Sequence, residues 1–109
     1  MNNEVRKVLA GNPLDYLSKK ELMLDEKGVL QALRWAIIAE LDAINFYEQL
    51  ASHIEDENVK KIFLAVANEE KEHVGEFLAL LLSLDKDLYK YLMDGFKEVE
   101  EETGIKTNL

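Results

Sequence analysis

Apolar residues recur at steps of three and four along two long stretches of the chain. In the first stretch these positions are Leu30, Leu33, Ile37, Glu40, Ile44, Tyr47, Ala51 and Ile54. In the second they are Val59, Phe63, Val66, Glu70, His73, Phe77, Leu80 and Leu84. This spacing forms the apolar seam that a helix turns toward a partner helix. We therefore predict two long helices, one running from Asp25 to Ile54 and the other from about Glu57 to Leu84.

The ends of these helices carry recognisable capping residues. Asp25 and Asp56 are suited to cap the two long helices, and Asp85 to cap a third helix that ends at Gly104. The buried stripe predicted for the third helix consists of Leu88, Leu92, Phe96 and Val99. The polar link between the long helices is so short that they must pack antiparallel. The chain is thus predicted to be all-α, with an N-terminal arm (1–24), a helical domain (25–103) and a short tail (104–109).

Three polar residues occupy seam positions where an apolar residue is expected. Glu40 lies on the first seam, and Glu70 and His73 lie on the second. An ionised carboxylate at such a position costs several kcal/mol, of the order of 3–5, unless it is paired or binds a metal. The Glu-x-x-His spacing of Glu70 and His73 puts both side chains on one helix face, about 5–6 Å apart at Cβ. The spacing alone also occurs by chance on solvated helix faces, but its place on the seam favours a metal site.

The hairpin geometry brings Glu40 to the same level as this pair. Residue 55, inside the link, is the midpoint of Glu40 and Glu70. Both glutamates therefore lie about 22 Å from the turn, side by side across the two helices. The same symmetry places Ile37 beside His73 and Tyr47 beside Phe63. The sequence predicts three metal ligands that converge from two helices.

Composition narrows the functional classes. The chain has 109 residues and a net charge of −9, which argues against binding to nucleic acid or to anionic membranes. It has no cysteine, which excludes disulfides, thiolate zinc sites and cysteine-held iron–sulfur clusters. The N-terminus has no apolar signal-peptide core, and no apolar run is long enough to span a membrane. We therefore expect a soluble, cytoplasmic protein.

The number of ligands indicates that one chain carries half of a site. A ferritin-like di-iron site takes one Glu from each of two helices and a Glu-x-x-His from each of two others. This chain supplies Glu40 and the pair Glu70 and His73, and no histidine lies near Glu40. A twofold dimer of hairpins would complete the set as a four-helix bundle. Further apolar residues on the first helix fit such contacts: Trp35, Ile38, Leu41 and Leu50.

At this point the chain resembles the encapsulated ferritin-like proteins. The resemblance covers residues 29 to about 102. The family pattern is a Glu on the first helix, a Tyr seven residues later and a Glu-x-x-His thirty residues after the first Glu. The matching residues in this chain are Glu40, Tyr47, Glu70 and His73. It implies a ferroxidase that oxidises Fe²⁺ to Fe³⁺ at a di-iron centre, two irons per homodimer. Glu40, Glu70 and His73 would then bind metal, with Tyr47 a further catalytic-site residue close to them. It also implies an annular decamer that works inside an encapsulin shell, where the oxidised iron is stored.

Two departures from the family pattern bear on these expectations. Members often carry carboxylates on both sides of the helix-one Glu, forming an outer site through which iron reaches the centre. Here the positions hold Ala39 and Asp42, which puts that site in doubt. Free-standing members also end in a shell-targeting peptide, for which residues 104–109 are too short. Because some relatives are fused to their shell protein, this chain could also be a domain excised from such a fusion.

Two other functions remain open. A rubrerythrin-like or other di-iron enzyme would act on peroxide or on an organic substrate, and would need an apolar pocket beside the metals. A non-enzymatic helical dimerisation module would use Glu40, Glu70 and His73 as a buried polar group or a structural zinc site. Zinc binding without oxygen consumption would favour this module.

Overall fold

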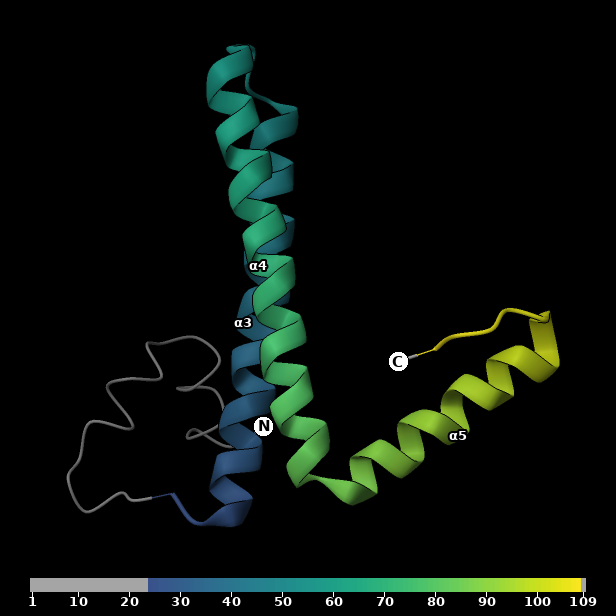
Figure 1. Cartoon of the computed structure of the whole chain (residues 1–109). Helices are drawn as coiled ribbons and strands as arrows, with labels where there is room; N and C mark the ends of the chain where they lie inside the picture. The colour runs from purple at the N-terminus through teal and green to yellow at the C-terminus, as the bar shows by residue number, and fades with distance from the viewer. Residues whose placement is uncertain (1–23, 109) are drawn as a thin grey trace, which may run out of the picture.

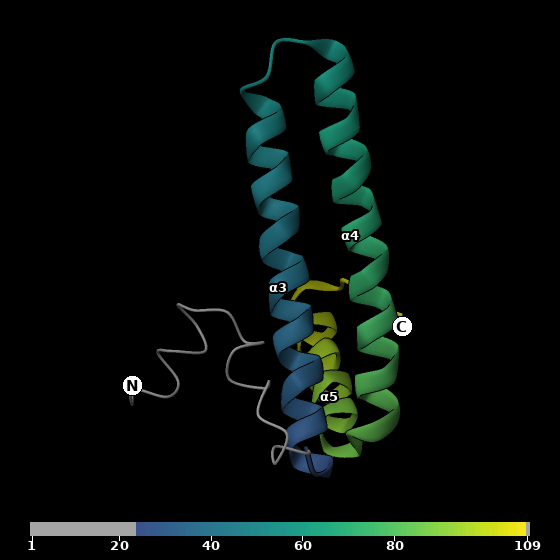
Figure 2. The same cartoon turned by 90° about the vertical axis from the view of Figure 1, so that its left-hand side faces the viewer.

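The computed structural model describes residues 24–108, which form three helices: α3 (Glu26–Ser52), α4 (Glu57–Leu84) and α5 (Lys86–Thr103). α3 and α4 lie side by side as a long antiparallel hairpin, and α5 leaves its base at a steep angle (Figures 1 and 2). All three elements are helical, so the predicted all-α class is confirmed. The predicted arm, residues 1–24, lies outside the described residues except for Leu24, and the division of the chain into domains stays a prediction.

The predicted caps set the helix boundaries. The carboxylate of Asp25 accepts a hydrogen bond from the backbone N–H of Gly28 at 2.8 Å. Asp56 accepts from the N–H groups of Asn58 and Val59 at 2.9 and 3.1 Å. These bonds satisfy backbone donors that have no partner inside the helix. At the other end of the chain α5 stops at Gly104, whose φ of 79° is the left-handed conformation that glycine adopts without steric cost.

The seam predicted for α3 is confirmed, whereas the one predicted for α4 is wrong at its ends. Every predicted seam position of α3 is buried or half-buried. On α4, Val59, Leu80 and Leu84 are exposed, and the most buried residues are Ala67 and Leu81. A straight α-helix has 3.6 residues per turn, so a strict seven-residue pattern drifts about 20° per repeat away from the partner. The contact stripe therefore passes from Phe77 to Leu81 rather than to Leu80.

The interior that one chain encloses is very small. Its buried apolar residues, within the described range, are Ala51, Ala67 and Leu81. Large apolar side chains elsewhere on the hairpin are exposed, among them Phe46 at 57% and Ile62 at 63%. Soluble monomers rarely leave so much contiguous apolar surface in water. Exposed apolar side chains of this size are typical of a protein–protein interface.

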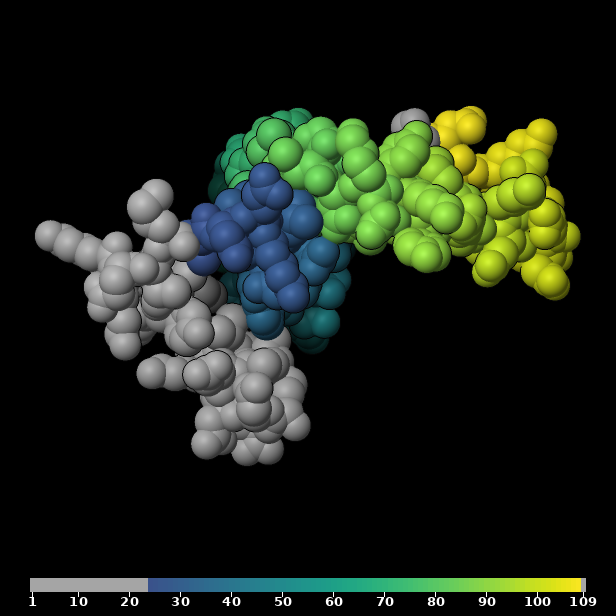
Figure 3. Space-filling view, turned by 90° about the horizontal axis from the view of Figure 1, so that it is seen from below, coloured from purple at the N-terminus to yellow at the C-terminus, as the bar shows by residue number. Residues whose placement is uncertain are grey.

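α5 stands away from the hairpin along most of its length. Viewed from below, it extends sideways from the base, and only its first part lies against α4 (Figure 3). Of the predicted stripe, Leu88, Leu92 and Phe96 are half-buried and Val99 is exposed, so the prediction of a buried stripe is correct only in part. No helix among residues 24–108 is long and apolar enough to cross a membrane.

Asp85 forms the whole connection between α4 and α5. Its N–H donates to the carbonyl of Leu81 at 2.8 Å, which closes α4. Its carboxylate accepts from the N–H of Leu88 at 3.0 Å and from the guanidinium of Arg34 at 2.8 Å. The hydrogen bond from the Leu88 backbone, and next that from Arg34, hold the pKa of Asp85 below its ordinary value, although burial acts in the opposite direction. Arg34 thereby joins α3 to the start of α5.

This arrangement predicts an acid sensitivity that depends on Arg34. Because the pKa of Asp85 is lowered in the folded chain, the stability it contributes is complete above about pH 4, the ordinary aspartate value, and is lost as the pH falls through the folded value. Replacing Arg34 with Met removes one cause of the lowered pKa. We expect the melting temperature of the Arg34→Met variant to fall less between about pH 5 and pH 3 than that of the wild type. The melting temperatures are measured by circular dichroism. An equal fall in the melting temperatures of the wild type and Arg34→Met over this pH range would contradict the role of Arg34 in lowering the pKa of Asp85.

Candidate metal centre

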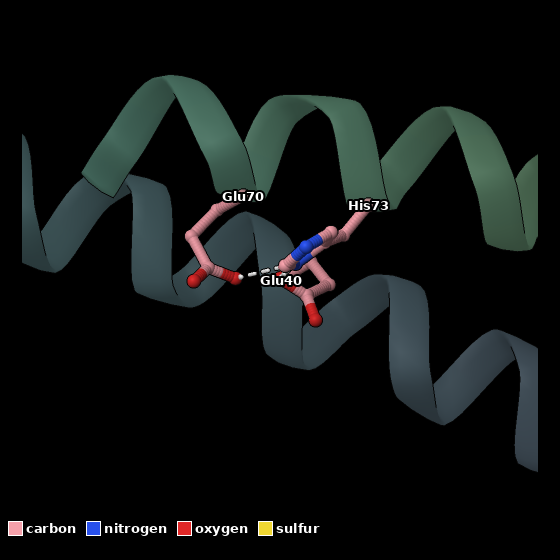
Figure 4. A group of neighbouring side chains, drawn as sticks. All are labelled: Glu40, Glu70 and His73. Atoms are coloured by element: carbon pink, nitrogen blue, oxygen red, sulfur yellow. Dashed lines mark hydrogen bonds and ion pairs between the residues drawn. The ribbon is translucent and has the colours of Figure 1, made fainter. Parts of the chain in front are cut away.

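Glu40, Glu70 and His73 converge midway along the hairpin (Figure 4). Glu40 extends from α3, whereas Glu70 and His73 extend from successive turns of α4. One ligand atom from each residue lies within 4.8 Å of the other two. In the part of the chain that the structure describes, these are the only three acidic or histidine side chains grouped closely enough to hold one metal ion. The predicted convergence at one level of the hairpin is confirmed.

The contacts within this group leave a carboxylate without adequate compensation. Nδ1 of His73 lies 3.4 Å from Oε2 of Glu40 and 3.4 Å from Oε2 of Glu70. One imidazole nitrogen can donate only one proton, so it cannot serve both carboxylates. Oε2 of Glu40 is buried and has no hydrogen-bond partner among the described residues. An unpaired buried oxygen of this kind costs about 1–3 kcal/mol, so the site favours a cation.

The chemical type of these three side chains and their exposure to solvent also suit the binding of a cation. The two glutamate side chains are 19% exposed and that of His73 is 43% exposed, so the group is partly desolvated but open on one side. Carboxylate and imidazole donors bind Fe²⁺ or Zn²⁺, and carboxylates bind Fe³⁺ strongly. Three protein ligands leave positions free for further ligands or for a substrate. The chemistry of these donors therefore fits a divalent metal ion.

Tyr47 lies nearer the hairpin tip and packs with aromatic rings. Its ring centroid is 5.4 Å from that of Phe46 and 5.9 Å from that of Phe63. The predicted pairing of Tyr47 with Phe63 across the hairpin is therefore confirmed. No hydrogen bond from Tyr47 to Glu40, Glu70 or His73 is present among the described residues, so its catalytic role stays a prediction.

His73 points to one side of the hairpin, away from an ion pair that joins the two helices. An ion pair of 3.1 Å between Lys71 and Glu48 bridges α4 and α3 on the opposite side. His73 and Phe46 each lie two residues from a member of this pair, about 200° around their helices, so both face the other way. Exposed apolar residues at helical spacing share this direction, and we call them the ligand-side face: Phe46, Leu50, Val59, Ile62, Leu80 and Leu84.

Sequence reasoning missed part of this surface. Ile62 was not assigned to either seam, although it lies three turns before His73 and shares its direction. The predicted seam of the second helix includes Leu80 and Leu84, and these two residues belong to the ligand-side face. The signal that could have found them is a second apolar stripe on α4, at steps of three and four that run beside the seam. Ala39 and Asp42, the two departures from the family pattern, are exposed on α3.

Comparison with known proteins gives a consistent result. Residues 31–108 match the Rubrerythrin family. The chain is 52% identical over 102 residues to a ferritin-like–encapsulin shell fusion protein of Pyrococcus furiosus. Its structure resembles the crystal structure of the encapsulated ferritin domain from Pyrococcus furiosus, with a TM-score of 0.76 and 57% identity over 79% of this chain and 88% of that one. The chain belongs to the encapsulated ferritin-like proteins. The predicted family is thus confirmed.

A second relative extends the comparison to cargo proteins. The ferritin-like chain is 34% identical over 76 residues to an encapsulin nanocompartment cargo protein of Myxococcus xanthus. The aligned region covers 70% of this chain and 57% of that protein. The Pyrococcus match covers 94% of this chain but only 29% of the fusion protein. The chain therefore spans less than a third of the fusion protein and a little over half of the cargo protein.

Proposed function

We propose that this chain is a ferroxidase, in which Glu40, Glu70 and His73 bind Fe²⁺ as the substrate. The observation that supports this most strongly is the buried, unpartnered Oε2 of Glu40 beside a single imidazole nitrogen. A bound cation would interact with both carboxylates at once, so His73 would no longer be their only partner. Membership of the ferritin-like family agrees with iron as that cation.

Two copies of the chain are proposed to share the reaction site. A ferritin-like site needs four helices, and one hairpin provides two of them with half the ligands. If two chains packed through their ligand-side faces about a twofold axis, the second chain would supply another Glu40, Glu70 and His73. This would complete the ligand set. The same contact would cover Phe46 and Ile62, which the single chain leaves exposed. Burying about 1,600 Å² in this way is typical of a stable interface.

In this dimer two Fe²⁺ ions would bind next to each other. Each Fe²⁺ gives up one electron, and one O₂ takes up both electrons and two protons to become H₂O₂. The protein contributes fixed carboxylates that stabilise the additional positive charge of Fe³⁺. The apolar ligand-side faces, once packed together, would exclude bulk water from around the site and strengthen these interactions.

The oxidised iron needs storage outside this chain. The hairpin and the third helix, residues 24–108, enclose no cavity large enough for mineral. The relatives are named as a shell fusion and as an encapsulin cargo protein. We therefore propose that this chain works with an encapsulin shell, inside the nanocompartment, as a ring of five dimers. Copurification with shell protein and sedimentation of the assembly would test the shell and the ring separately.

Peroxide is a second candidate oxidant, because the matching family is Rubrerythrin. The di-iron reaction would use the same protein ligands, but one H₂O₂ would accept the two electrons and two protons and yield two water molecules. Comparing the initial rate of Fe²⁺ oxidation with O₂ and, anaerobically, with H₂O₂ distinguishes the two. A faster reaction with peroxide would identify a peroxidase rather than an oxygen-dependent ferroxidase.

The proposal is tested by adding Fe²⁺ aerobically to metal-free protein. We expect oxygen uptake and the absorbance of Fe³⁺ to rise together, well above the rate in buffer alone. The rival is a structural zinc site, which uses the same ligands without redox chemistry. A rate equal to that of buffer, together with tight zinc binding, would contradict the ferroxidase and support the structural module.

A further inference from the structure

Only a short connection joins α5 to the hairpin. α4 ends at Leu84 and α5 begins at Lys86, so a single residue, Asp85, separates the two helices. Beyond this junction α5 extends into open space, with exposed Tyr89, Tyr91 and Val99 (Figures 1 and 3). The direction of α5 therefore depends on interactions at Asp85, and this direction decides where its exposed aromatic and apolar side chains stand.

Asp85 is held from three directions at once. Its N–H binds the end of α4 at Leu81, and its carboxylate binds the start of α5 at Leu88. The third interaction is the 2.8 Å ion pair with Arg34, which comes from α3, 51 residues earlier. Asp85 is only 9% exposed and is the only buried charged residue in the described part of the chain. A charge in this position is retained only where its hydrogen bonds are satisfied.

The ion pair adds a constraint that the caps alone do not give. The hydrogen bonds to Leu81 and Leu88 fix Asp85 to the helix ends, but both are local and leave the angle between the helices free. Arg34 ties the same carboxylate to a different helix, so rotation of α5 would break a short, charge-assisted hydrogen bond. We infer that Arg34 and Asp85 form a clamp that holds α5 at a fixed angle to the hairpin. Both act as positioning residues.

The clamp is independent of the proposed iron site. Arg34 lies fourteen residues before Glu48, nearly four full turns, so both side chains leave α3 on the same side of the hairpin. That is the side of the Lys71–Glu48 ion pair, opposite to the ligand-side face. The clamp can therefore be broken without touching Glu40, Glu70 or His73, and its failure would leave the proposed ferroxidase intact.

The absence of cysteine makes the clamp directly measurable. Cysteines introduced at Gln49, on α3, and at Lys97, on α5, are the sole attachment points for spin labels; both positions are exposed and distant from the junction. Labelled chains are assembled with a large excess of unlabelled protein, so that only distances within one chain are recorded by pulsed electron resonance. The wild type should give a single narrow distance distribution.

Two variants weaken the clamp in different ways. Arg34→Met keeps the unbranched stem and removes the guanidinium, and Asp85→Asn keeps a good capping side chain and removes the charge. We expect both to lose the single narrow distance and to give a broad distribution at unchanged helix content. The matched control, Lys71→Met, breaks the Lys71–Glu48 ion pair between α3 and α4 and should retain the wild-type distribution. Wild-type distributions in both Arg34→Met and Asp85→Asn would overturn the clamp.

Discussion

Replacing Glu40 with Gln is expected to abolish iron oxidation and, at the same time, to stabilise the metal-free protein. The amide has nearly the same shape as the carboxylate but carries no charge, so the buried Oε2 no longer needs a cation. Removing the charge should raise the free energy of unfolding of the metal-free chain by about 1 kcal/mol. The initial rate of Fe²⁺ oxidation should fall by about 100-fold or more, because loss of a ligand costs at least as much as loss of a residue that supports one.

A higher free energy of unfolding together with a lower oxidation rate would show that Glu40 contributes to iron oxidation and not to the stability of the metal-free fold. Urea unfolding of metal-free protein and the oxidation rate are measured on the same preparations. Glu69→Gln is the matched control, since Glu69 is an exposed glutamate on α4 next to Glu70. We expect it to leave both quantities unchanged. A metal-free Glu40→Gln protein that is less stable than the wild type would indicate that Glu40 has a structural partner instead.

Replacing Ile62 with Glu tests whether two chains share the site. Ile62 is 63% exposed in a single chain and lies eleven residues from His73, about 16 Å along α4, so it cannot touch the ligands. A charge at this position on each of two packed ligand-side faces would be buried without a partner, which costs several kcal/mol, about 3–5. We expect sedimentation to show loss of the assembly, circular dichroism to show loss of helix in the separated chains, and the oxidation rate to fall by about 100-fold or more, as for loss of a ligand.

The matched control for this variant is Ile105→Glu. Ile105 is as exposed as Ile62, at 59%, but lies beyond α5 and outside the ligand-side face. It should keep both the assembly and the oxidation rate of the wild type. A folded monomer of Ile62→Glu that oxidises iron at the wild-type rate would show that one chain holds the whole site, and the shared centre would have to be abandoned.

The sequence was sufficient for those features that depend on local rules. The aspartates at 25, 56 and 85 and the glycine at 104 mark helix ends because each satisfies backbone groups within a few residues of itself. The symmetry of an antiparallel hairpin then brings Glu40 to the level of Glu70, and this needs only a helical rise and the position of the turn. The group of three candidate ligands was therefore predictable from the order of residues alone.

Features that depend on helix-to-helix geometry were not predictable in this way. The seven-residue pattern continues through Leu80 and Leu84, yet the drift of a straight helix carries the contact to Leu81. The pair Arg34 and Asp85 has no sequence signal, because 51 residues separate its members and their meeting depends on how α5 leaves the hairpin. Of the surplus apolar residues predicted on the first helix (Trp35, Ile38, Leu41 and Leu50), only Leu50 belongs to the ligand-side face.

The near absence of an interior has a consequence for what stability means in this protein. With two alanines and one leucine as its fully buried apolar residues, the described part of a single chain withdraws little apolar surface from water to offset the ordering of its backbone. In the proposed dimer the exposed apolar side chains of the ligand-side face would be covered, so folding and association would be one equilibrium. The melting temperature is then not a constant of the chain but rises with protein concentration, as mass action requires. Dilution alone would unfold it.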